Sequence, residues 1–403
     1  MDILPAPNAR RLRRLPLRRT RRRRPGPGTL LLALVALAAG TLLVPSITAG
    51  GLASVDEIHY TFSGPTSVTF DWRGSADDLQ YGTTASYRAT VYGTTPNPAP
   101  ISSSGPWWEA TITGLAAGAT YHYSIGGGAD GTFAAAPTGS FRFTSVGDIG
   151  SSATYPRIAT IQSLMAADDP AFGLILGDLT YRNNNGADDV DQHFNDVMAW
   201  STTAAYMPAW GNHEYETGDD LSNYKGRFDI PNDSASTGAP SEGCCGEDWG
   251  WFDAGGVRFI SYPEPYAGST LGQWAAAADV VMDAAQSSAS VNFIVTFGHR
   301  APYSTGSHGG NVNLAGFLDG LADGHSKYVL DLSGHNHDYE RFEPIHGVIH
   351  IVAGTGGRSL AAWSSTDPRI ASRARHFGHL RVDVTSTSIT VGFVCGPSTT
   401  SED

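Results

Sequence analysis

The feature that most constrains the fold is a pair of histidines at the end of an apolar segment. Residues 328–332 form the apolar run, and Gly334-His335-Asn336-His337 closes it. Alternate side chains of a β-strand share a face, so His335 and His337 can converge on one point at the end of this strand. Imidazoles that meet at the carboxyl end of a buried strand are natural metal ligands. Taken alone, the segment is read more simply as a turn with two surface histidines.

Four further segments have the same design, in which an apolar strand ends in a polar cluster. In chain order the clusters are Gly147-Asp148-Ile149-Gly150, Gly177-Asp178-Leu179-Thr180-Tyr181, Gly211-Asn212-His213-Glu214 and Gly298-His299-Arg300. Together with the histidine pair, they bring carboxylate, phenol, amide and imidazole groups to five strand ends. Oxygen and nitrogen donors in this number predict a site for two metal ions.

This ordered set resembles the calcineurin-like metallophosphoesterases, and Tyr181, three residues after Asp178, narrows the resemblance to the purple acid phosphatases. The resemblance implies an α/β catalytic domain with four layers in the order α/β/β/α. It also implies that Asp178 bridges two ions. The implied metal ligands are Asp148, Asp178, Tyr181, Asn212, His299, His335 and His337.

The identity of the ions follows from the donors. A phenol has a pKa near ~10, so only a strongly polarising trivalent cation deprotonates it at mild pH. Tyr181 therefore indicates Fe(III) in one site, as in the purple enzymes, although an aromatic side chain at a domain edge is the simpler reading. Asn212, His299 and His335 suit a divalent ion, and the expected cofactor is a dinuclear centre of Fe(III) with Zn, Mn or Fe(II).

Three residues are expected to act on the substrate. The family uses the histidine of its Gly-Asn-His-Glu motif to contact phosphate or to protonate the leaving oxygen, and the resemblance gives this role to His213. His308, in a Gly-rich loop, resembles a substrate-contacting histidine of the family. Arg300 resembles a residue beside the phosphate, with a supporting salt bridge as the alternative. Glu214 and Asp338 are expected to orient metal-bound histidines.

The resemblance implies hydrolysis of phosphate esters by in-line attack of a metal-bound hydroxide, which needs no covalent phosphoenzyme. The first hypothesis is a secreted phosphomonoesterase. The alternative is a phosphodiesterase of the same superfamily acting on nucleotides or phospholipid headgroups, because the same metals catalyse both reactions. A third hypothesis, a non-catalytic binding protein that keeps the fold, predicts the loss of ligands, and all seven are present.

Charge separates the N-terminal segment from the rest of the chain. The net charge of the 403 residues is −13, and the ten Arg and one Asp of residues 1–49 leave −22 for the remainder. An acidic body argues against a nucleic-acid surface. The resemblance implies small phosphorylated substrates as the partners. Cys244, Cys245 and Cys395 are too few for a disulfide framework, and their pairing is open, as is the oligomeric state.

The first 50 residues have the layout of a secretory signal. All ten Arg lie in residues 1–24, an apolar run follows at 29–44, and small residues follow that run. The run is shorter than the ~20 residues that span a bilayer, so we expect cleavage between Ala49 and Ala53 and no stable membrane span. The mature protein is expected to be secreted or extracytoplasmic, by Sec or twin-arginine export.

Residues 54–138 alternate between short β-rich segments and turns. The expected strands are 60–62, 67–72, 87–92, 108–113 and 120–125. Leu115, Gly118, Tyr121 and Tyr123 suggest a tyrosine corner, in which a phenol ties down a loop, and hence an all-β sandwich of the fibronectin type III kind. No catalytic constellation occurs in this domain, which we interpret as a packing and positioning module.

Residues 139–398 alternate between strands and helices, the pattern of an α/β domain. We expect strands at 141–146, 172–176, 206–210, 293–297, 348–353, 380–384 and 388–394, a hairpin at 249–262, and helices at 155–167, 188–200, 271–286 and 312–322. Residues 217–248 are expected to be a long loop at the border of the active site.

Overall fold

The computed structural model describes residues 54–181, 188–215, 222–233, 246–264 and 270–396. These residues belong to one compact unit that runs from Gly51 to Asp403. The predicted secretory signal, Cys244 and Cys245 lie outside the described residues. Within the described ranges, no helix combines the length and the apolar character that a membrane crossing requires.

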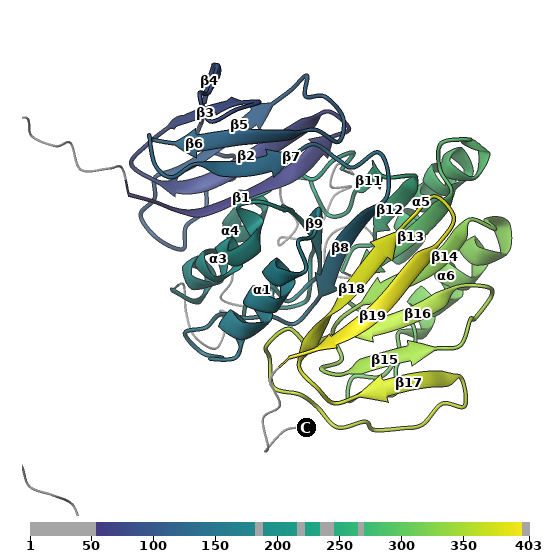
Figure 1. Ribbon diagram of the computed structural model, residues 1–403. Helices are drawn as coiled ribbons and strands as arrows, with labels where there is room; N and C mark the ends of the chain where they lie inside the picture. The colour runs from purple at the N-terminus through teal and green to yellow at the C-terminus, as the bar shows by residue number, and fades with distance from the viewer. Residues whose placement is uncertain (1–53, 182–187, 216–221, 234–245, 265–269, 397–403) are drawn as a thin grey trace, which may run out of the picture. The chain divides into compact units, whose positions relative to one another are not determined.

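The N-terminal part is built from two antiparallel sheets (Figure 1). The first has the order β1-β2-β5, from Val55–Gly64, Ser67–Gly74 and Trp107–Ile112. The second has the order β4-β3-β6-β7, from Ala89–Tyr92, Asp78–Gly82, Thr120–Ile125 and Gly131–Ala134. Apolar side chains of both sheets form one core, in which the ring of Phe70 lies 4.8 Å from that of Tyr123 and 5.1 Å from that of Phe133.

The predicted tyrosine-corner contact is present in this part. The hydroxyl of Tyr121 accepts a hydrogen bond from the backbone N–H of Ala116 over 2.9 Å. Two strands of the second sheet, β3 and β7, were not predicted. Strand β3 begins at an Asp and β7 is only four residues long, so neither shows a clear alternation of apolar and polar residues.

The remaining part has two larger sheets. The first has the order β10-β9-β8-β18-β19. Its strands β8 (Phe141–Val146), β9 (Phe172–Leu176) and β10 (Ala205–Ala209) are parallel to one another. Strands β18 and β19 are Gly378–Val384 and Ile389–Cys395. The second has the order β11-β12-β13-β14-β16-β15-β17. Its strands are Trp251–Ala254, Val257–Ser261, Phe293–Gly298, Tyr328–Ser333, Ile349–Ala353, Tyr339–Phe342 and Ile370–Ala374.

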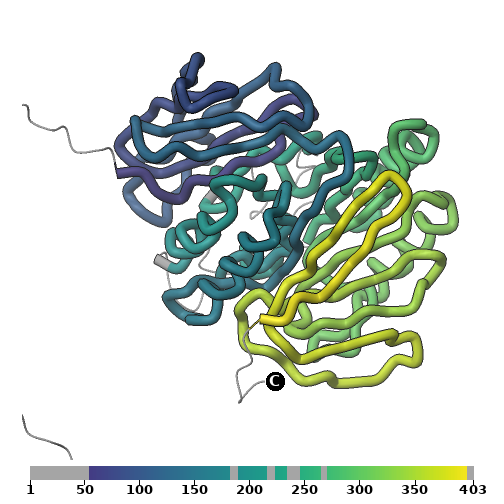
Figure 2. The backbone as a smooth tube through the Cα atoms, in the orientation of Figure 1, coloured from purple at the N-terminus to yellow at the C-terminus, as the bar shows by residue number. Residues whose placement is uncertain are grey.

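Helices cover the outer faces of these two sheets, as the backbone tube shows (Figure 2). Apolar residues of the two inner faces meet in a common core. Helices α1 (Ile158–Ala167) and α3 (Asp188–Ser201) pack on the first sheet, and α5 (Leu271–Ser287) and α6 (Val312–Gly324) pack on the second. The layers therefore follow the order α/β/β/α. A further short helix, α4, spans Ser222–Lys225.

Some elements of this part differ from the expectation. The helix expected from residue 155 begins at Ile158, because Thr154 and Tyr155 donate backbone hydrogen bonds to Ser151 in a preceding turn. Strands β15 and β17 were not predicted, since each is short and carries charged residues, such as Glu340 in β15 and Arg373 in β17. The boundary at residues 138 and 139 between two domains stays a prediction.

Candidate metal centre

The predicted ligands follow the carboxyl ends of parallel strands in both large sheets. Asp148, Asp178 and Asn212 follow β8, β9 and β10, which are mutually parallel neighbours in the first sheet. His299 and the histidine pair follow β13 and β14, which are parallel neighbours in the second sheet. The carboxyl ends of parallel strands are where open α/β sheets bind ligands, and here two sheets contribute to one site.

One group of predicted ligands surrounds the Nε2 atom of His299. This nitrogen lies 3.3 Å from Asp178 Oδ1, 3.2 Å from Asn212 Oδ1 and 3.1 Å from His335 Nδ1. The four groups come from four different strands. One carboxylate, one amide oxygen and two imidazoles form a borderline nitrogen and oxygen set that suits a divalent ion.

A second group surrounds Asp148. Its Oδ1 atom lies 3.2 Å from His337 Nε2 and accepts a hydrogen bond from the Tyr181 hydroxyl over 3.1 Å. The two groups adjoin, because ligand atoms of Asp148, Asp178 and His299 all lie within 4.8 Å of one another and all three residues are buried. All seven predicted ligands are thus brought together in two adjacent sets.

Tight turns present several of these groups. Asp148, Asp178 and His335 have φ values of 59°, 48° and 68°, in the left-handed region that few residues other than glycine adopt. This corrects the expectation that His335 and His337 alternate along an extended strand. Strand β14 ends at Ser333, and the turn after it brings the two imidazoles into the site.

Two glycines leave room for the ligands. Gly177 has a φ of +77°, and a Cβ atom there would lie 2.7 Å from the Cβ of His299. A Cβ atom on Gly334 would lie 2.7 Å from Asp148 Oδ2. These close approaches explain the glycines that precede Asp178 and His335 in the sequence.

The buried carboxylates of Asp148 and Asp178 are stabilised by a positive charge between them. Burial alone lowers the pKa of His299, but the carboxylates of Asp178 and Asp148 outweigh burial and raise it to about 10. Burial alone raises the pKa of Asp178, but His299 holds that pKa well below its usual range. Because two desolvated carboxylates favour a cation between them, the described residues fit a metal centre.

Two of the other predicted ligands are neutral in this arrangement. Burial and the adjacent cations of His299 and Arg300 lower the pKa of His335 to about 2, which leaves its imidazole lone pair available. Burial and the carboxylates of Asp148 and Asp178 raise the pKa of Tyr181 well above its usual range. Only a strongly polarising cation would therefore ionise this phenol.

The candidate substrate-contacting residues lie at the edge of the centre. The ring of His213 lies 4.3 Å from that of Tyr181, and its Nε2 atom lies 3.8 Å from Asp178 Oδ2. The ring of His308 lies 4.5 Å from that of His335. A cavity of about 190 Å³ opens beside His308 and His335. Its other lining residues are Arg300, Ala301, Gly309, Gly310 and Asn311.

Arg300 is held on both sides of its guanidinium. Its Nε atom donates to Glu264 Oε1, and its Nη1 atom lies 3.2 Å from His335 Nε2. The salt bridge that was the alternative reading of Arg300 is therefore present, and the side chain still borders the cavity.

Glu214 and Asp338 were expected to orient metal-bound histidines, and the structure shows other contacts. The Glu214 carboxylate accepts backbone hydrogen bonds from Asp178, Leu179 and Gly211 over 3.0, 2.9 and 2.7 Å, so it joins two ligand loops. Among the described residues, neither Asp338 oxygen has a hydrogen-bond partner. Backbone carbonyls contact the histidines instead: Leu176 O lies 2.9 Å from His299 Nδ1, and Ser359 O lies 3.0 Å from His337 Nδ1.

Sequence reasoning missed Arg358. Its backbone N–H donates to the Asp148 carbonyl over 3.0 Å, and its guanidinium carbon lies 5.1 Å from the centre of the Tyr181 ring. A signal was available, because Gly-Thr-Gly-Gly-Arg directly follows β16, so that a polar cluster again comes after an apolar strand. Arg358 places a cation beside the phenol that is expected to bind iron.

Comparison with known proteins agrees with this architecture. Residues 141–339 match the family model described as calcineurin-like phosphoesterase. The uncharacterized proteins MT2654 and Rv2577 of two Mycobacterium tuberculosis strains are 29% identical over 259 residues, which cover 54% of this chain and 46% of each relative. The match thus spans about half the length of these relatives.

Two solved structures share the fold. Purple acid phosphatase PPD1 from yellow lupin seeds (Lupinus luteus) aligns with a TM-score of 0.65 at 18% identity, over 85% of this chain and 72% of that chain. PhoD aligns with a TM-score of 0.59 at 12% identity, over 83% of this chain and 88% of that chain. The family match covers the strands that carry the predicted ligands, and the two structures share the layered sheets that bring those ligands together. Residues 141–339 therefore match the calcineurin-like phosphoesterase family, and the chain has the fold of purple acid phosphatase PPD1 and PhoD.

Proposed function

We propose that this protein is a secreted dinuclear-metal phosphomonoesterase of the purple acid phosphatase type, acting on small phosphorylated substrates. The observation that carries the proposal is the convergence of seven donors in two adjoining sets, with the carboxylate of Asp178 close to both. The match to the calcineurin-like phosphoesterase family model supports a hydrolase of phosphoric esters, and the expected ligand set supports the purple acid phosphatase type.

In this proposal Asp148, Asp178, Tyr181 and His337 hold Fe(III), and Asp178, Asn212, His299 and His335 hold Zn, Mn or Fe(II). Two bound cations would supply positive charge to the phosphate oxygens and an activated water molecule. The ligands themselves are mainly carboxylates and neutral groups, so the bound ions, with Arg300 and Arg358 beside them, would attract an anionic ester.

Two histidines would then handle charge and protons at the substrate. His213 is fixed by its backbone N–H, which donates to Asp178 Oδ1 over 2.9 Å, and its side chain is 17% exposed. An imidazole held at the open edge of the centre can give a proton to the leaving oxygen. His308 is placed by the hydrogen bond from its N–H to Asn336 Oδ1 over 2.8 Å, so that its ring can face the phosphate across the cavity.

The cavity beside the centre supports a monoester substrate. Its volume of about 190 Å³ suits a small phosphate ester next to His335. Arg300 and His308 add polar side chains to its lining.

The decisive experiment compares kcat/KM for a chromogenic phosphate monoester, p-nitrophenyl phosphate, with that for the matched diester, bis(p-nitrophenyl) phosphate. The iron- and zinc-loaded protein is used, with a His379→Gln variant as the control, since His379 pairs with Asp168 away from the centre. We expect a large preference for the monoester in both proteins. A preference for the diester would replace the proposal with a phosphodiesterase, and no turnover of either would leave a non-catalytic binding protein.

We also propose that residues 1–50 direct export and are removed, and that residues 54–138 form a module of the fibronectin type III kind. The sequence layout supports export, and the two sheets with the Tyr121 corner support the module. N-terminal sequencing of protein recovered from the culture medium tests export, with a new terminus between Ala49 and Ala53 expected. Protein retained in the cytoplasm with its first residues intact would contradict it.

A further inference from the structure

Helix α3 contacts two different parts of the molecule through opposite faces. Asp189, His193 and Asp196 recur at intervals of four and three residues, so they share one face of the helix. Asp191 and Asn195 are each two residues from a member of that set, which places them on the opposite face. The first face meets the loops of the candidate metal centre, and the second meets the β-rich N-terminal part.

The first face holds the segment that follows Asp148 and the backbone of Tyr181. Asp189 is buried, and its carboxylate accepts from the Tyr181 backbone N–H over 3.2 Å and from the Ser151 hydroxyl. The Asp196 carboxylate accepts from the Ser152 backbone N–H over 2.6 Å and from its hydroxyl over 2.7 Å.

His193 adds a further contact on the same face, because its Nδ1 atom lies 2.9 Å from the Gly150 carbonyl oxygen. Three side chains of one helix therefore fix the turn between Asp148 and α1. The backbone of Tyr181 is fixed by the same helix, although Tyr181 belongs to the loop after β9.

The second face is anchored by charges. The Asp191 carboxylate pairs with Arg73 of β2 and with Arg227, whose Nη2 atom lies 3.2 Å from Asp191 Oδ1, and it accepts from the Ser102 hydroxyl. Asn195 accepts from the Glu57 backbone N–H over 3.4 Å. The residues after the helix continue this contact, because the Thr203 carbonyl accepts from the Tyr60 hydroxyl over 3.1 Å.

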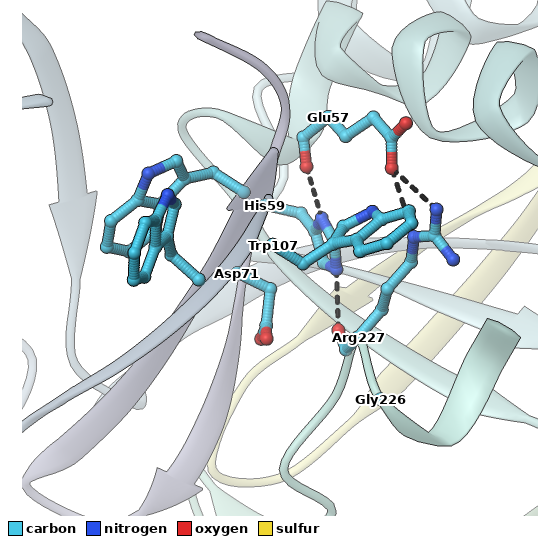
Figure 3. Close-up of a pocket in the computed structure, with 8 residues that line it drawn as sticks. Glu57, His59, Asp71, Trp107, Gly226 and Arg227 are labelled. Atoms are coloured by element: carbon cyan, nitrogen blue, oxygen red, sulfur yellow. Dashed lines mark hydrogen bonds and ion pairs between the residues drawn. The ribbon is translucent and has the colours of Figure 1, made fainter. Parts of the chain in front are cut away.

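Arg227 also contacts Glu57 and His59 of β1, as the close-up shows (Figure 3). Its guanidinium donates to Glu57 Oε2 over 2.9 and 3.0 Å, and its carbonyl oxygen lies 2.6 Å from His59 Nε2. Its side chain is 2% exposed, and that of Glu57 is 1% exposed. Removing one partner of a buried ion pair costs several kcal/mol of stability in other proteins. The ion pairs of Arg227 therefore hold β1, α3 and the chain around Arg227 in one relative arrangement.

We propose that α3 couples the docking of the N-terminal β-rich part to the geometry of the candidate metal centre. Asp189 and Asp196 act as positioning residues for the Asp148 loop and for Tyr181, and Asp191 anchors the helix that carries them. The inference rests on the proposed function, since it concerns the ligands of that centre. A rigid helix with bonds on both faces moves its two sets of partners together, so a disturbance at Asp191 reaches Ser152 and Tyr181.

The experiment compares three variants of the full mature chain. Asp191→Asn weakens the contact with the N-terminal part, and Asp189→Asn weakens the contact with Tyr181. Asp168→Asn is the matched control, because Asp168 pairs with His379 and Arg381 over 2.7 and 3.0 Å but touches neither the metal loops nor the N-terminal part. Its side chain is 9% exposed, against 14% for Asp191.

Two measurements separate coupling from a general loss of stability. Zinc is titrated into the metal-free protein by calorimetry, and hydrogen exchange is followed in peptides that contain Ser152 and Tyr181. We expect Asp191→Asn to raise the Kd for zinc by about 2- to 30-fold. We expect Asp189→Asn to raise it by about 10-fold or more. Both variants should speed exchange at Ser152 and Tyr181, whereas Asp168→Asn should lower the Tm and leave both measurements unchanged.

Wild-type zinc affinity and exchange in a folded Asp191→Asn protein would overturn the coupling while leaving the proposed function intact. A wild-type protein that binds no zinc or iron would overturn the proposed function and the coupling with it. If Asp191→Asn does not fold, Ser102→Ala replaces it, because this change removes one hydrogen bond to Asp191. The expected direction is the same with a smaller effect, and unchanged exchange would again overturn the coupling.

Discussion

The phenol of Tyr181 lies between Asp148 and His337, donating to Asp148 Oδ1 over 3.1 Å with its oxygen 3.5 Å from His337 Nε2. These three groups come from three different strand ends. Because the phenol is neutral and buried, its proton is what a trivalent cation would displace.

Replacing Tyr181 by Phe is expected to abolish the visible charge-transfer absorption of the iron-loaded protein, since no phenolate would then bind Fe(III). Tyr155→Phe is the control, because the Tyr155 ring lies 6.1 Å from that of Tyr181 and its hydroxyl accepts from Arg358. Absorption spectra and iron content of both variants provide the measurement. Colour that survives in Tyr181→Phe would remove Tyr181 from the ligands.

His335→Ala and His213→Ala should have different effects on metal content. His335 lies 3.1 Å from His299, so its loss should release the divalent ion. The loss of kcat should exceed about 100-fold, which is the upper end of the effect of removing a residue that only supports a metal ligand. His213→Ala should keep both ions and lower kcat by about 100-fold or more, as expected for a lost general acid. Metal analysis of each purified variant distinguishes the two roles. Two retained ions with normal turnover in His335→Ala would contradict the dinuclear assignment.

Glu214→Gln should weaken the joint between the Asp178 and Asn212 loops. The buried carboxylate accepts hydrogen bonds from three backbone N–H groups, and an amide, with one oxygen, accepts them less well. The free energy of unfolding should therefore fall by about 1–3 kcal/mol. Metal affinity should fall about 10-fold. Glu340→Gln is the control, since the buried Glu340 accepts from Thr305 and Ser304 in the loop before His308. Denaturant unfolding should weaken in both variants, and zinc titration should change only in Glu214→Gln.

Glu247 gives the protein a predictable pH dependence. Burial raises its pKa from 4.5 to about 8, with Asp229 and Asp233 adding to the rise. The folded chain therefore keeps a proton that the unfolded chain loses between these two values. The free energy of unfolding should fall as pH rises through this range, by at most ~1.4 kcal/mol per pH unit from this group.

Glu247→Gln should flatten that dependence and stabilise the protein near the upper end of the range, because the amide can still accept from the Ile230 N–H. Urea unfolding at several pH values provides the measurement. Asp383→Asn is the control, since Asp383 is half-exposed and pairs with Arg142 at the surface. A Glu247→Gln protein with the pH profile of the wild type would show that Glu247 is ionised in the folded state.

The sequence was most informative where a local signal coincides with a structural rule. Each polar cluster that follows an apolar strand lies at a carboxyl end, and parallel pairing of the strands brings these ends together. The ligands that the family resemblance of these clusters implies therefore lie close together in the fold. Turn geometry could not be predicted, because the positive φ of His335 depends on the Asp148 carboxylate, which accepts from the His335 N–H over 2.8 Å.

Residues that act through long-range contacts were beyond sequence reasoning. Asp189 resembles any acidic residue near the start of a helix, and only the fold reveals that it holds the Tyr181 backbone. Asp191 and Arg73 are 118 positions apart, so no local pattern links them. Strands β15 and β17 were missed for a related reason, because short charged strands are defined by their neighbours in the sheet.

The origin of the predicted ligands in both large sheets has a consequence for unfolding. Asp148 and Asp178 belong to one sheet, and His299 and His335 belong to the other. A cation bound between them fastens the sheets to each other, so that separating the sheets also means giving up the ion. The melting temperature should then rise with free metal concentration, and a chelator should convert a single cooperative transition into a broader one.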